Sequence, residues 1–316
     1  MRFEGARLSL RLHRFELIAF GAALGGLVLV TFVAAAYVTS LMPGPECLQS
    51  PDLIPQDCQR AQQAFSSAQQ ALGGLLMAPL LLVTYAIGLF LGVPIVAREL
   101  ERGTARIAWW LAPSRWRWYV ARVVPVLVVL IVLTYGAGLA SDRFFAVSLS
   151  GVDPTRSFEG YGARGGLLAS RAVFIFGISV AVGSILGRAL PSVIISALVV
   201  TIGLWGGTQV HQAILKLEAV AIPLDMNDEF GGYRPGDMYL DQRFVLPDGT
   251  LVDYGYFGNE GPAYDEFGNS TYPTVNLVIP GERYRFVEGR EALALGGASL
   301  VALLLGAGVV ARRRPG

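Results

Sequence analysis

LIAFGAALGGLVLVTFVAAAYVTSL, residues 17–41, runs for 25 residues without a charged side chain. About 20 apolar residues in an α-helix cross the roughly 30 Å of hydrocarbon in a bilayer. Five more apolar stretches of spanning length follow, near residues 71–96, 119–140, 167–187, 190–207 and 291–311. The sequence therefore predicts an all-α polytopic membrane protein with six transmembrane helices.

The composition supports this prediction and excludes several classes of function. The chain is 53% hydrophobic and 16% charged, whereas soluble domains carry about 25% charged residues. The net charge of +1 gives no indication of a nucleic-acid partner. Two cysteines and two histidines are too few for the usual thiolate zinc, iron–sulfur or HExxH sites, so we expect no metal site and no catalytic residue.

The distribution of Lys and Arg predicts the orientation of the helices. Cytoplasmic loops of membrane proteins carry the excess of positive charge. If both termini are cytoplasmic, the cytoplasmic segments hold 14 Lys and Arg residues and the two short outer loops hold five. All but one of the 25 basic residues are arginine, a bias typical of a GC-rich bacterial genome. We expect a multi-pass protein of a bacterial cytoplasmic membrane, with N- and C-termini inside.

The first outer segment, roughly residues 42–70, contains both cysteines, Cys47 and Cys58. On the oxidising side of a membrane, two cysteines this close in sequence favour a disulfide that closes the loop. Two free thiols are the alternative, because sequence does not give the distance between them. The polar stretch that follows Cys58 is helix-forming.

The third outer segment, residues 208–290, is long enough to be a small extracytoplasmic domain. It holds 13 acidic residues against six basic ones. Its stretch RFVLPDGTLVDYGYF predicts a β-hairpin that turns at residues 247–249, so we expect a β-rich or irregular domain. The acidic pairs at 228–229 and 265–266 lack EF-hand spacing, which favours solvated surface over calcium ligands.

Residues 1–16 are a basic, amphipathic segment before the first predicted helix. Two compatible interpretations stay open: a positive flank that sets topology, and an interfacial helix on the cytoplasmic leaflet. The predicted organisation is then this segment, transmembrane helices 1–5 over 17–207, the extracytoplasmic domain over 208–290, and the sixth helix with a cytoplasmic tail over 291–316.

The most informative stretch is VPIVARELERGTARIAWWLAPSRWRWYVARV, residues 93–123, in the cytoplasmic loop after the second predicted helix. Its many charges argue against a position inside the bilayer. Residues 97–111 have helical periodicity with an apolar and a charged face. Such a helix either docks a partner protein or only caps two spans. The aromatic and basic residues are typical of anchors at the membrane interface; they are Trp109, Arg115, Trp116 and Trp118.

The chain lacks an ATP-binding motif of the P-loop type. Its only lysine, Lys216, lies in AILKLEA, which has neither the glycines nor the hydroxyl residue of GxxxxGK[ST]. If ATP hydrolysis by a P-loop protein drives this chain, another chain must therefore supply the P-loop.

The segment PIVARELERGTARIAWWLAPSRWRWYVAR resembles the signature of type-2 ABC exporter permeases, especially actinobacterial members that carry ARELERGT. The stretch WLAP at 110–113 departs from a more polar sequence in that pattern. A second stretch, RYRFVEGREALALGGASLVALLLG, resembles the start of the sixth helix in that family, with Glu288 or Glu291 at its glutamate. The residues that match the first pattern are Ala97, Arg98, Glu99, Glu101, Gly103, Thr104, Ile107, Ala108, Trp109, Ser114, Arg115 and Trp118.

This resemblance implies a coupling loop at 97–118, whose helix at 97–111 docks on a separate ABC ATPase subunit. The ATPase subunit binds ATP and Mg, and this chain holds no cofactor of its own. A second permease subunit, identical or paralogous, completes the transporter within membrane lipids. The implied ATPase contacts are Glu99, Glu101, Arg102 and Arg106, and the residues that shape the loop are Gly103 and Thr104.

The predicted cargo is a small amphipathic or lipidic compound, a class that includes drugs and antibiotics, because the spans hold few charges. An alternative function is a membrane sensor or scaffold with a ligand-binding outer domain, against which only the ARELERGT resemblance argues. An intramembrane enzyme is disfavoured, because the predicted spans contain almost no ionisable residues. Gly21, Gly25 and Gly26 allow close helix packing, either at a dimer seam or within one subunit.

Overall fold

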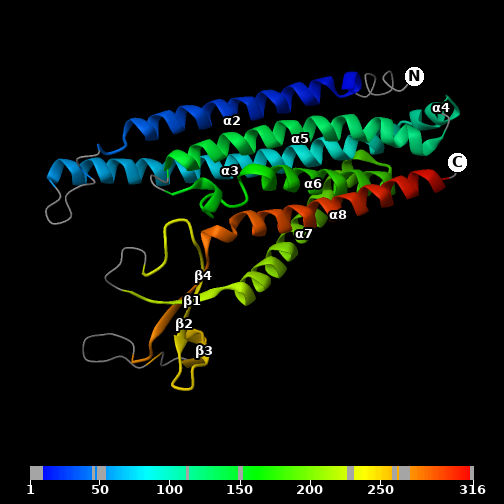
Figure 1. The fold of residues 1–316 in the computed structure, drawn as a ribbon. Helices are drawn as coiled ribbons and strands as arrows, with labels where there is room; N and C mark the ends of the chain where they lie inside the picture. Colours follow the sequence, from blue (N-terminus) through cyan, green and yellow to red (C-terminus); the bar gives the residue numbers. More distant parts are fainter. Residues whose placement is uncertain are drawn as a thin grey trace. The chain divides into compact units, whose positions relative to one another are not determined.

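The computed structural model describes two compact units (Figure 1). Unit 1 comprises residues 1–150, 160–204 and 288–316, and unit 2 comprises residues 151–159 and 205–287. The residues that the structure describes are 10–44, 47, 55–111, 114–148, 152–225, 231–257, 262 and 271–313. Residues 1–9 lie outside this part, so the interpretation of the N-terminal segment stays a prediction.

Long helices make up unit 1, and two of them continue into unit 2. They are α2 (Arg14–Ser40), α3 (Gln56–Glu101), α5 (Arg115–Ser148), α6 (Gly165–Leu186), α7 (Ala189–Glu218) and α8 (Tyr284–Arg312), with a short α4 (Thr104–Leu111). Six helices in the described chain, all except α4, are long and apolar enough to cross a membrane. The prediction of a polytopic protein with six membrane-spanning helices is confirmed by this count.

Several helices extend beyond the predicted spans. α3 is 46 residues long, roughly 70 Å at 1.5 Å per residue. It begins well before residue 71 because its first part, rich in Gln and Ala, favours helix and contains no Gly or Pro. α7 continues to Glu218 and α8 begins at Tyr284, so the expected boundaries at 207 and 291 fall inside helices.

Glycines allow α3 and α6 to approach closely. α2, α3, α5 and α6 run side by side (Figure 1), and α3 packs most extensively on α6. A Cβ at Gly88 would lie 2.8 Å from the Cβ of Ile175, and one at Gly92 would lie 2.7 Å from the Cβ of Ser179. Small residues at such positions are typical of packed membrane helices.

The glycines of α2 are different. A Cβ at Gly21, Gly25 or Gly26 would meet nothing within 4 Å in the described chain. These glycines therefore do not support close helix packing within this subunit. Their packing at a dimer seam, the other interpretation, stays a prediction.

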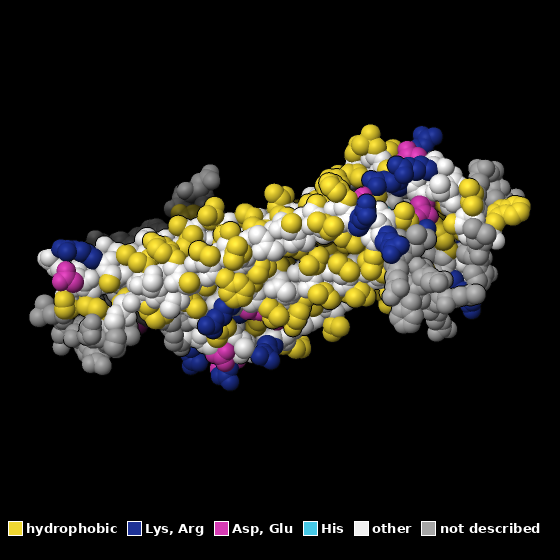
Figure 2. Space-filling model, turned by 90° about the horizontal axis from the view of Figure 1, so that it is seen from above, with side chains coloured by type: hydrophobic (Ala, Val, Ile, Leu, Met, Phe, Trp, Pro, Cys, Tyr) yellow, Lys and Arg dark blue, Asp and Glu magenta, His cyan; other side chains and the backbone are white. Residues whose placement is uncertain are grey.

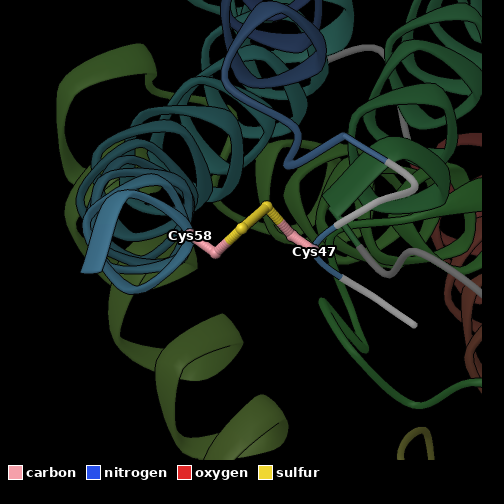
Figure 3. Close-up of a disulfide and its surroundings, with 2 residues drawn as sticks. All are labelled: Cys47 and Cys58. Carbon is pink, nitrogen blue, oxygen red and sulfur yellow. A yellow bond between two sulfur atoms is a disulfide. The ribbon is translucent and has the colours of Figure 1, made fainter. Parts of the chain in front are cut away.

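Cys47 and Cys58 form a disulfide, with their Cα atoms 5.4 Å apart (Figure 3). Cys58 lies in the first turn of α3, and Cys47 lies in the connection from α2. The predicted disulfide is confirmed.

Unit 2 contains a four-stranded antiparallel sheet in the order β1-β4-β2-β3. The strands are β1 (Val220–Pro223), β2 (Met238–Val245), β3 (Leu251–Val252) and β4 (Thr274–Ile279). β2 and β3 form the predicted hairpin, in which Phe244 pairs with Val252. Gly249 adopts a φ of 83° in its turn, a left-handed conformation that glycine adopts readily. The acidic pairs at 228–229 and 265–266 lie outside the described residues.

Candidate functional site

A sharp turn divides the segment that the sequence singled out. α3 ends at Glu101 and α4 begins at Thr104. Gly103 lies between them with a φ of 71°, which only glycine adopts without strain. The Thr104 hydroxyl donates a hydrogen bond to the carbonyl of Glu99 at 3.3 Å. The single helix expected over residues 97–111 is therefore corrected to two helices joined by a glycine turn.

The last turn of α3 contacts α2 through Arg98. Its guanidinium lies 3.1 Å from the Glu16 carboxylate in a half-exposed ion pair. His13, just before α2, is buried near the same charges. Burial lowers the pKa of His13; Glu16 acts in the opposite direction, and Arg98 and Arg122 lower this pKa further.

The next residue of α3 reaches α5. Glu99 forms an ion pair with Arg122, with 3.0 Å between Oε1 and Nη2. Their side chains are only 18% and 12% exposed. Glu99 therefore already has a buried partner within the chain, although its position in the sequence indicated a contact with another subunit.

Glu101 reaches α7 instead. Its Oε2 accepts a hydrogen bond from the backbone N–H of Ala189 at 2.9 Å. Ala189 is the first residue of α7, where backbone N–H groups lack partners within the helix. A carboxylate there also interacts favourably with the helix dipole. Three side chains in one turn of α3 thus contact three other helices.

The exposed surface of this region is apolar and basic. Ile107 and Trp110 are 66% and 88% exposed. They lie three residues apart, on the same face of α4, whereas Ala105 is buried. Arg102 is also exposed, and the side chain of Arg106 lies outside the described part. We call Arg102, Ile107 and Trp110 the α4 surface; Arg106 stays a predicted contact on α4.

Three of the expected interface anchors pack inside the chain. Trp109 and Trp118 meet edge to face with ring centroids 5.9 Å apart, and the Arg115 guanidinium lies 4.8 Å from the Trp109 ring centroid. Arg115 also donates to the carbonyl of Ala311 at 3.3 Å, in the last turn of α8. Trp116 remains 47% exposed.

Two more residues beside these anchors are Ser114, at the start of α5, and Trp110, for which the sequence analysis gave no role. Ser114 begins α5 as an N-cap, because its Oγ accepts from the N–H of Arg117 at 3.2 Å. Trp110 was missed as a functional candidate. Its signal was the i, i+3 spacing from Ile107.

A second polar network, also missed, joins α5, α6 and α8 at their other ends. Arg164 lies 2.8 Å from Asp142, and Arg171 lies 3.0 Å from Glu291. Glu288 accepts hydrogen bonds from backbone N–H groups in the first turn of α6. Charged residues at the edges of predicted spans were the available signal. No group of three or more metal-ligating side chains occurs among the described residues.

Apolar side chains are spread along the face shown in Figure 2, and charged side chains gather there in a few groups. This distribution is expected of helices that meet lipid along their length and water at their ends. Most of each long helix is thus suited to a bilayer.

Comparison with known families gives one match. A family model described as ABC-2 membrane transporter related matches residues 17–211, more than half of the chain. The matched region contains most of α2, all of α3 to α6 with the α4 surface, and most of α7. No curated protein and no solved structure matches the chain.

Proposed function

Because the chain belongs to the ABC-2 membrane transporter related family, we propose that it is the transmembrane permease subunit of an ATP-driven ABC exporter. A separate ATPase subunit binds ATP and Mg, and this chain performs no catalysis. The observation that carries the proposal is the α4 surface, in which exposed Ile107 and Trp110 of a short helix lie next to exposed Arg102 within the matched region.

The α4 surface is the proposed docking site for the ATPase subunit. Large apolar side chains such as Trp110 commonly dominate the energy of protein interfaces. Arg102 and Arg106 add charge-assisted hydrogen bonds to carboxylates of the partner. Glu101 is exposed at the edge of this surface, while Glu99 is held by Arg122. This arrangement favours Trp110 and the arginines over Glu99 as the direct contacts.

The disulfide supports the orientation in which α4 is cytoplasmic. Disulfides persist on the oxidising side of the membrane, and Cys58 lies in the first turn of α3. α3 then crosses the bilayer and ends beside α4. Roughly 65 Å of helix separate Cys58 from Glu101, about twice the thickness of the hydrocarbon core. Both termini are then cytoplasmic, and the sheet of unit 2 is extracytoplasmic.

Two permease chains, identical or paralogous, form the transport pathway in this proposal. The α2 glycines Gly21 and Gly25 have open space around them, and their spacing suits close packing with another helix. Trp116 is exposed and positioned to meet lipid headgroups. The proposed cargo is a small amphipathic or lipidic compound, including drugs and antibiotics, because the spans are mostly apolar.

The test is co-expression with ABC ATPase subunits of the same organism, followed by affinity purification in detergent. We expect co-purification, and faster ATP hydrolysis by the complex in lipid vesicles. Changing Ile107 and Trp110 to Ala should abolish co-purification. The control, Trp205→Ala, removes a 67% exposed tryptophan from α7 and should bind normally.

Two results would contradict the proposal. If the unmodified chain neither binds the ATPase nor changes its turnover, the permease assignment fails. If it binds but leaves hydrolysis unchanged with and without cargo candidates, the sensor or scaffold function is favoured instead.

A further inference from the structure

We infer that Glu99 and Glu101 are positioning residues that transmit movement of α4 to α5 and α7. This inference rests on the proposed function, but it assigns the two glutamates to contacts within the chain. It separates residues that hold the ATPase subunit from residues that pass its movement to the spans.

The geometry of one helical turn makes this division of contacts possible. Successive residues of an α-helix are rotated by about 100°, so Glu99 points about 100° from Arg98, and Glu101 points about 60° from Arg98 on the opposite side. They contact Glu16 on α2, Arg122 on α5 and the N-terminus of α7. A displacement of this turn therefore acts on three helices at once.

The contact to α5 is the more rigid one. Glu99 and Arg122 are mostly buried, and a buried charge is unfavourable without its partner. The backbone of Glu99 also accepts the Thr104 hydroxyl of α4. One residue thus joins the start of α4 to α5, and a push on α4 moves α5 with it.

The contact to α7 is the more easily broken one. Glu101 is exposed, so water replaces the Ala189 N–H at little cost. α7 follows α6 directly, after Gly187 with a φ of 66°. Glu101 therefore links α3 to the turn between these two spans, and it can release that turn when α3 moves.

The test uses Glu99→Gln and Glu101→Gln in the complex with the ATPase subunit. Glutamine keeps the size of each side chain and removes its charge. We expect both variants to co-purify with the ATPase as the unmodified chain does, and to lose at least a threefold stimulation of ATP hydrolysis in vesicles. The control is Glu282→Gln, which removes the charge of an exposed side chain paired with Arg234 in unit 2 and should retain stimulation.

A charge exchange adds a readout that a purely structural role would not give. Glu99→Arg alone should lose stimulation, and Glu99→Arg with Arg122→Glu should regain most of it. If the buried variants do not fold, as judged by gel filtration and thermal unfolding, Glu101→Gln alone decides the inference.

Loss of ATPase binding by Glu101→Gln would overturn the inference, because the residue would then be a direct contact. Unchanged stimulation would overturn it as well. Absence of ATPase binding by the unmodified chain contradicts the proposed function instead, so the two failures are distinguishable.

Discussion

Arg164 is almost fully buried, and its Nε lies 2.8 Å from Oδ1 of Asp142. The pair ties the residue before α6 to the last part of α5. Arg164 also lies over the Phe145 ring, 5.8 Å from the centroid. Because Arg164 is 2% exposed, its charge depends on protein partners rather than on water.

Asp142→Ala should therefore destabilise the protein. Removal of one partner from a buried pair costs about 3–5 kcal/mol, and we expect the lower end because Asp142 is 32% exposed. The measurement is the thermal unfolding midpoint in detergent. Glu282→Ala removes an exposed partner of Arg234 and serves as the control, with little expected change. Equal effects of both substitutions would contradict the importance of burial.

The disulfide should stabilise the protein and mark one side of the membrane. Closing a loop of roughly this size stabilises by about 3 kcal/mol, so reductant should lower the unfolding midpoint. The double variant with Cys47→Ser and Cys58→Ser should already have the lower unfolding midpoint, and reductant should not change it.

The same disulfide tests the orientation in spheroplasts. A membrane-impermeant reductant should open it in intact spheroplasts, whereas a cysteine introduced at Arg102 should react with an impermeant thiol reagent only after lysis. The reverse pattern would overturn the proposed topology.

Gly103→Ala isolates backbone strain in the turn before α4. Among the described residues, a Cβ there meets nothing within 4 Å, so the expected effect comes from the positive φ of 71°. A non-glycine residue in this conformation costs about 1–2 kcal/mol. Gly74→Ala is the matched control, since it is helical and equally open, and it should be neutral or slightly stabilising. Equal unfolding midpoints for Gly103→Ala and Gly74→Ala would exclude this strain.

His13 should make stability depend on pH. Burial lowers its pKa, and Arg98 and Arg122 lower it further against the opposing effect of Glu16. The unfolded chain therefore binds this proton more readily than the folded chain. Stability from His13 is complete above its unfolded pKa and decreases as the pH falls toward its folded pKa. Between pH 7.5 and pH 5, the unfolding midpoint of His13→Gln should fall less than that of the unmodified chain. An equal fall in the two proteins would contradict His13 as the cause.

The apolar runs predicted the spans because burial in lipid demands continuous hydrophobicity. The same signal could not give the helix ends, since α3 begins at the polar Gln56 and α7 ends at the polar Glu218. Helix propensity rather than hydrophobicity sets those ends. The hairpin was predictable because the PDG sequence before Thr250 specifies a tight turn.

The contacts of the candidate site were less accessible from sequence. Arg122 and Ala189 lie far along the chain from Glu99 and Glu101, and no periodicity connects them. The turn at Gly103 also changes the helical phase between α3 and α4. Trp109 packs inward and Trp110 outward, and continuing the helical phase of α3 across the turn could not predict which of the two faces inward.

The uninterrupted course of α3 fixes the angular phase between its two ends. Cys58 must face Cys47 while Glu99 and Glu101 face α5 and α7. One inserted residue in between would rotate one end by about 100° relative to the other. Seven inserted residues would nearly restore the angle but add about 10 Å of length. The number of residues in this helix is therefore constrained as strictly as their identity.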